Sequence, residues 1–208
     1  MAIGFLLLLE QTHRFWWGLH ILGVVFGLGA ATVTDVMFLH FMRNFRIERR
    51  EAEIMETLSK IIWVGLGLLV VSGLALMLPR WDFFVGSERF LMKMTAVAIV
   101  LINGLFLNFW LQPRARKISF IKPERELSQK EIDERSRLRR TAFVLGGVSV
   151  VSWYGAFALA VLTMLTLSYG ELFLIFVGLM GVAVLGSQIK ELNYREQVEE
   201  ELGEEVLE

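Results

Sequence analysis

Cysteine is missing from the 208 residues of this sequence, and its charged residues are gathered into blocks between long uncharged stretches. Without cysteine the chain can form neither disulfides nor cysteine-ligated zinc and iron–sulfur sites. A polybasic tail of the kind that binds nucleic acid is also missing, because the Lys and Arg residues adjoin hydrophobic stretches. No phosphate-binding loop, metalloprotease helix motif or plausible Ser–His–acid set is present. The sequence therefore gives no support to hydrolase or nucleotide chemistry, or to a nucleic-acid partner.

Hydrophobic residues are abundant instead, at 55% of the chain, with a mean hydropathy of +0.54. A helix needs about 20 apolar residues to cross the bilayer, because each residue adds about 1.5 Å to its length. Five stretches meet this requirement, at about 13–42, 61–78, 91–111, 141–167 and 172–189. We therefore expect an all-α fold, an integral membrane bundle of five transmembrane helices within a single domain, residues 1–190. Residues 191–208 form an acidic tail, and residues 1–12 a short apolar segment at the outer interface.

The basic residues predict how the bundle is oriented. Of the 21 Lys and Arg residues, 17 lie in segments 43–60, 112–140 and 190–208, and the other four lie on the opposite side of the expected spans. Loops rich in Lys and Arg stay in the cytoplasm. The sequence thus predicts an outer N-terminus and a cytoplasmic C-terminus, in the inner (plasma) membrane of a bacterium.

Asp35 interrupts the first span, where a charged side chain costs about 2.5–3.5 kcal/mol on insertion scales. Counting residues from the ends of the spans predicts that Asn103, Ser149 and Ser152 lie at a similar depth. These four residues would form one polar layer. The layer either joins helices by hydrogen bonds or forms a proton or cation site, and the sequence leaves both readings open.

Two of the three histidines, His13 and His20, share a face of the first helix with Asp35 on a helical wheel. Met92 and Met94 are expected near the same outer end, and His with Met suits copper(I). The alternative is that these methionines only fill helix interfaces. Haem is a further possibility, although His13 and His20 are about 10.5 Å apart along one helix and cannot both bind one iron. A second haem ligand would have to come from a dimer or from methionine.

Residues 19–23 (LHILG) and 26–29 (FGLG) give the chain a resemblance to two bacterial families. These are the copper-resistance D type membrane proteins and the membrane-bound protoporphyrinogen oxidases, whose first span carries a histidine followed by small residues. The stretch 27–42 also resembles uncharacterised bacterial polytopic membrane proteins. In the oxidases that histidine is taken to ligate haem b, so the resemblance implies this role for His20. The oxidases need a second histidine on the third span, where this chain has Lys93 and Met94.

Three functions follow from these observations. The first is transport or permeation of a cation, a proton or copper, along the face of the first helix. The second, implied by the resemblance, is a haem b redox protein or porphyrin oxidase that uses His20. The third is a non-catalytic scaffold that forms a homo-oligomer or binds a membrane partner, and in which the polar groups only pack.

Overall fold

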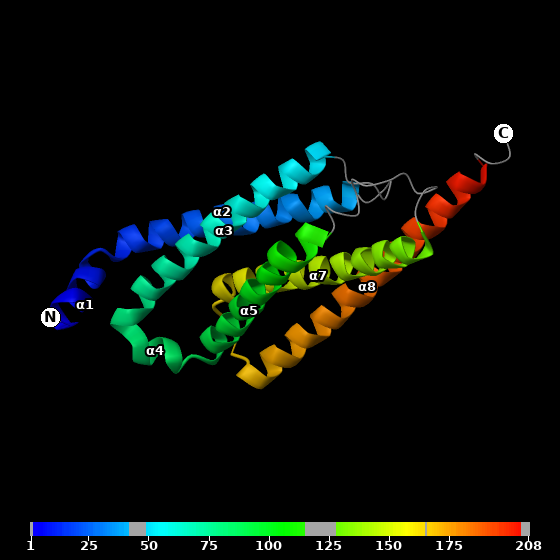
Figure 1. Cartoon of the computed structure of the whole chain (residues 1–208). Coiled ribbons are helices and arrows are strands. Elements are labelled where there is room, and N and C mark those ends of the chain that lie inside the picture. Colours follow the sequence, from blue (N-terminus) through cyan, green and yellow to red (C-terminus); the bar gives the residue numbers. More distant parts are fainter. Residues whose placement is uncertain (1, 42–48, 115–127, 165, 205–208) are drawn as a thin grey trace.

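The fold is all-α, with helices and no strand among the residues that the computed structural model describes, namely 2–41, 49–114, 128–164 and 166–204 (Figure 1). The elements, in chain order, are α1 (Ala2–Gln11), α2 (His13–Phe41), α3 (Arg49–Met77), a 3-10 turn η2 (Leu78–Arg80), α4 (Trp81–Val85), α5 (Glu88–Leu105), a π-helical turn η3 (Phe106–Leu111), α7 (Gln129–Val161) and α8 (Tyr169–Glu204).

Five helices are long and apolar enough to cross a membrane, which confirms this part of the sequence prediction. Their ranges are His13–Phe38, Arg50–Val85, Glu88–Arg114, Asp133–Val161 and Tyr169–Asn193. Large apolar side chains also point outward, among them Leu174 at 72% exposure and Val182 at 69%. Apolar surface of this extent is typical of a protein whose surroundings are hydrocarbon rather than water.

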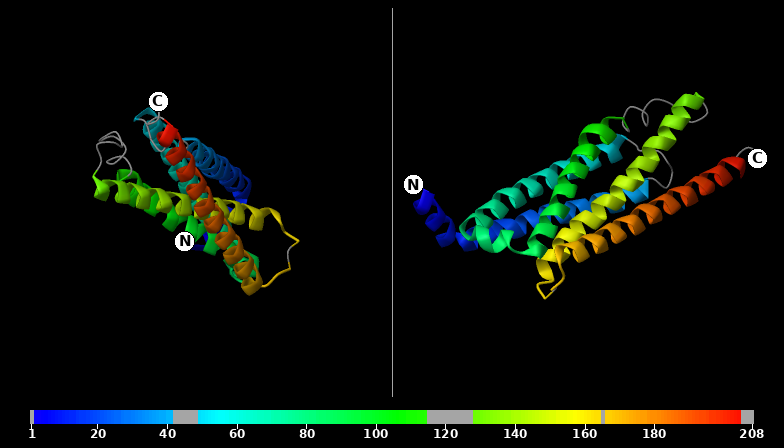
Figure 2. Two further views of the ribbon diagram at one scale, coloured as in Figure 1. Left: turned by 90° about the vertical axis from the view of Figure 1, so that its right-hand side faces the viewer. Right: turned by 90° about the horizontal axis from the view of Figure 1, so that it is seen from below.

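The helices form two groups, which Figures 1 and 2 show from three directions. In the first group α2 and α3 run side by side along most of their length. In the second group α7 packs against both α5 and α8. Helix α7 also touches α2, and this contact joins the two groups.

Two elements of the chain end where local sequence requires it. Helix α3 stops at Met77 and passes into the 3-10 turn η2, because Pro79 has no N–H to donate to the carbonyl oxygen four residues earlier. Helix α7 stops at Val161, earlier than the end near residue 167 that the hydropathy indicates. The next helix, α8, begins at Tyr169 because Ser168 and Glu171 form a reciprocal capping box: the Ser168 N–H donates to Glu171 Oε2 at 2.8 Å, and the Glu171 N–H donates to Ser168 Oγ at 3.4 Å.

Glycines allow α2 and α3 to approach closely. A Cβ atom added at Gly65 would lie 2.3 Å from the backbone nitrogen of Gly27, and one added at Gly23 would lie 2.9 Å from Leu69 Cγ. A Cβ at Gly27 would also meet the ring of Trp153 at 2.7 Å. Small residues let helix backbones come together in this way. Gly27 is thus in contact with α3 through Gly65 and with α7 through Trp153.

We expect Gly65→Ala to destabilise the bundle, because the new methyl group would meet backbone atoms of α2 that cannot move separately. Overpacking of this kind costs about 1–3 kcal/mol. Gly67→Ala, two residues along the same helix, is the matched control, because a Cβ at Gly67 has no neighbour within 4 Å. Thermal unfolding of both variants in detergent measures the difference. Equal melting temperatures would contradict the assigned contact.

Candidate functional site

Asp35 lies on the face of α2 that looks into the bundle. Ala31, one turn before it, belongs to a buried apolar cluster with Leu66 of α3, Val100 of α5 and Trp153 of α7. Phe38, one turn after it, packs on a second apolar cluster. The buried members of that second cluster are Leu111, Leu138 and Ala142, with Leu107, Trp110 and Leu145 packed beside them. Residues three and four apart share a helix face, so Asp35 lies between the two clusters.

Helix α5 carries Asn103 between the same two clusters. Val100 belongs to the first cluster and Leu107 packs on the second, with Asn103 between them in sequence. The Asn103 side chain is 5% exposed, and its Nδ2 donates to the backbone oxygen of Leu145 at 3.0 Å. Its Oδ1 is buried without a hydrogen-bond partner among the described residues. An unpaired buried acceptor costs about 1–3 kcal/mol, so this amide needs an explanation.

Helix α7 contributes Ser149, which is buried between Leu145 of the second cluster and Trp153 of the first. The contacts therefore bring Asp35, Asn103 and Ser149 to one level of the bundle. Ser152 lies one turn further along α7, and its hydroxyl donates to the backbone oxygen of Val148 at 2.6 Å. Ser152 is thus satisfied by its own helix, at the level of Trp153.

No hydrogen bond or ion pair joins the Asp35 carboxyl to another described side chain. An isolated charge is very costly in an apolar interior, where a carboxyl group instead takes a proton or receives a cation. Neighbouring Thr34 offers no help, because its hydroxyl donates to the backbone oxygen of Ala30 at 2.7 Å. Among the described residues, this level therefore combines a carboxyl group without a partner and an amide oxygen without a donor.

His20 is held by a serine that the sequence did not single out. Its Nδ1 lies 2.9 Å from Oγ of Ser72, which is fully buried on α3. The single Ser72 hydroxyl hydrogen points to the backbone oxygen of Leu68 at 2.5 Å, so Ser72 must accept from His20. In the neutral ring this places the hydrogen on Nδ1 and leaves Nε2 as an acceptor.

The residues of the expected metal set, His13, His20, Met92 and Met94, have different surroundings. His13 is exposed at the first residue of α2. Met92 is fully buried against Leu172 and Phe176 of α8, while Met94 faces outward. The described residues contain no group of three or more His, Cys, Asp or Glu side chains that could hold a metal ion. The arrangement therefore gives no support to a copper or haem site built from these residues.

Comparisons with protein-family models, with curated proteins and with solved structures find no match to this chain. The likeness to the copper-resistance D and protoporphyrinogen oxidase families therefore stays a prediction from residues 19–29.

The tautomer of His20 can be measured directly. Nitrogen NMR spectra of histidine-labelled protein should show a protonated Nδ1 and a bare Nε2 at neutral pH. Ser72→Ala should remove this preference, because the acceptor for Nδ1–H is lost. Ser187→Ala is the control, since that hydroxyl donates to the backbone oxygen of Val184 within its own helix. A wild-type ring with its hydrogen on Nε2 would contradict the assignment.

Proposed function

We propose that this chain is a multi-pass membrane protein that binds and moves protons through Asp35. The observation that carries the proposal is a carboxyl group between two apolar clusters, without a hydrogen-bond or ion-pair partner among the described residues. Ionisable groups inside membrane spans are rare, and they mark ion pathways and proton relays.

The membrane orientation belongs to the same proposal. The start of α3, the start of α7, the end of α8 and the C-terminal end of the span Glu88–Arg114 lie at one end of the bundle. The segments that adjoin this end, 43–60, 112–140 and 190–208, hold 17 of the 21 basic residues. We call this the basic end of the bundle. The excess of Lys and Arg supports a cytoplasmic position for the basic end, with the start of α2 on the outer side. The setting is the inner membrane of a bacterium.

The ligands at the level of Asp35 favour a proton over copper. Asp35, Asn103 and Ser149 offer oxygen atoms alone, whereas copper(I) prefers sulfur and imidazole ligands. A protonated carboxyl group is a hydrogen-bond donor, and the unpaired Oδ1 of Asn103 is an acceptor at the same level. Proton uptake by Asp35 would therefore satisfy both groups at once.

The two apolar clusters separate Asp35 from both ends of the bundle. The Ala31 cluster lies toward the outer side, and the Phe38 cluster lies toward the basic end. A proton that moves along the bundle between Asp35 and either end therefore passes one of these clusters. His20, with its Nε2 acceptor, is a second proton-accepting group on α2 beyond the Ala31 cluster.

Asp35→Asn should abolish proton flux in reconstituted vesicles, because an amide side chain neither releases nor takes up a proton near neutral pH. Asp35→Glu should retain part of the flux. The control is Asp82→Asn, since Asp82 is exposed on α4 away from the two clusters. Proton entry is followed with a pH-sensitive dye, and size-exclusion profiles check folding. Wild-type flux in a folded Asp35→Asn variant would overturn the proposal.

Asn103→Leu separates the proposed role from simple helix packing. The change removes a buried oxygen that has no partner, so we expect thermal stability to stay the same or rise. Proton flux should fall, because the protonated Asp35 loses its acceptor. If the amide serves only to join α5 to α7, Asn103→Leu would instead lower the melting temperature and leave flux unchanged in the folded fraction.

A further inference from the structure

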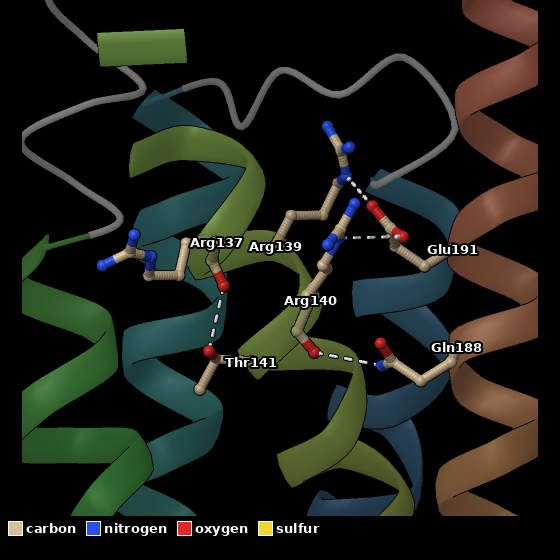
Figure 3. Close-up of polar contacts among 6 residues, drawn as sticks. All are labelled: Arg137, Arg139, Arg140, Thr141, Gln188 and Glu191. Carbon is tan, nitrogen blue, oxygen red and sulfur yellow. Dashed lines mark hydrogen bonds and ion pairs between the residues drawn. The ribbon is translucent and has the colours of Figure 1, made fainter. Parts of the chain in front are cut away.

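A buried carboxylate forms ion pairs with two arginines at the basic end of the bundle (Figure 3). Glu191 of α8 is only 1% exposed, although it lies at the start of the stretch that its acidic composition assigns to a tail. Its Oε1 accepts from Arg139 Nε at 2.7 Å, and its Oε2 lies 3.7 Å from Arg140 Nε. Gln188 Nε2 donates to the backbone oxygen of Arg140 at 3.4 Å, which adds a second tie between α7 and α8.

Among the described residues, the Glu191 carboxylate faces both guanidinium groups, and the two arginines differ in how they contact it. The Arg139 side chain is 14% exposed and its bond to Glu191 is short, so this pair ties the helices together. The Arg140 side chain is 50% exposed, and its contact with Glu191 is too long for a hydrogen bond. Its two terminal nitrogens are donors on the exposed side of the cluster.

The surroundings of Arg140 are amphipathic. Thr141, the next residue, begins the uncharged part of α7. On α8 the side chains of Leu185, Ile189 and Leu192 flank Gln188 and Glu191, and they are 66%, 59% and 48% exposed. A positive group thus lies beside an outward apolar surface, which suits a molecule with one anionic head and an apolar tail.

We infer that Arg140, held by Glu191 and flanked by Arg139, binds the phosphodiester headgroup of an anionic phospholipid. A phosphodiester carries one negative charge, which is complementary to the half-exposed guanidinium of Arg140. Guanidinium groups bind phosphate oxygens through directed hydrogen bonds. The acyl chains lie along the exposed apolar side chains of α8. This site is separate from the Asp35 level and does not depend on the proposed proton function.

The test compares phosphatidylglycerol, phosphatidylcholine and inorganic phosphate as stabilisers of the detergent-purified full chain. We expect phosphatidylglycerol to raise the melting temperature more than phosphatidylcholine does, and phosphate alone to have no effect. Arg140→Gln should weaken phosphatidylglycerol binding by about tenfold or more, because a charge-assisted hydrogen bond is lost. Arg114→Gln is the matched control, since this exposed arginine ends the span Glu88–Arg114 and donates to the backbone oxygen of Trp110 at 3.0 Å.

Three results would overturn the inference. Equal stabilisation of the wild type by the two lipids would remove the preference for an anionic headgroup. Full stabilisation by inorganic phosphate, lost in Arg140→Gln, would assign the site to a soluble anion. Unchanged phosphatidylglycerol binding in Arg140→Gln would place the lipid elsewhere. Should Arg140→Gln fail to fold, native mass spectrometry of lipids bound to the wild type still decides the first comparison, and the phosphate arm decides the second.

Discussion

The close approach of α2 and α3 at Gly27 and Gly65 determines where the other groups of the bundle lie. Because neither residue has a side chain, the two backbones touch, and Ala31 comes against Leu66 one turn further along. The bare surface at Gly27 also receives the ring of Trp153, which brings α7 against the pair. Asp35 follows Ala31 by one turn. The position of the Asp35 carboxyl group therefore depends on the contact between Gly27 and Gly65, two helical turns away, although neither glycine has a side chain.

Polar groups inside the bundle differ in whether their own helix satisfies them. The hydroxyls of Thr32, Thr34 and Ser152 each donate to a backbone oxygen one turn earlier. Such groups can sit among apolar neighbours at little cost. The Asp35 carboxyl and the Asn103 Oδ1 have no such local partner, because an acceptor cannot bond to helix carbonyls. This contrast, rather than the number of polar residues, distinguishes the level of Asp35 from the rest of the interior.

The sequence predicted the helices better than it predicted their contacts. Uncharged stretches identify the five long helices, since hydropathy is a property of each segment alone. The end of α7 was missed, because residues beyond Val161 are apolar even though the chain turns there. The pairing of His20 with Ser72 was missed as well, since a serine within an apolar helix usually bonds to its own backbone. Glu191 could have been found: Arg139 and Arg140 directly precede one uncharged stretch, and Glu191 follows another with only Lys190 between. The depth that residue counting gives for Asn103 and Ser149 agrees with their neighbours in the two clusters, while their role stays a prediction.

The π-helical turn Phe106–Leu111 determines which way the last residues of the span Glu88–Arg114 face. A π turn holds one more residue than an α turn, so the residues after it face differently from those of a continuous α-helix. Within this turn Asn108 accepts from the hydroxyl of Ser59 on α3, at 3.3 Å. Leu111 belongs to the apolar cluster on which Phe38 packs. Loss of a single residue here would leave a regular helix in which everything beyond is turned by about 100°. Chains related to this one should therefore conserve the length of this segment more strictly than its side chains.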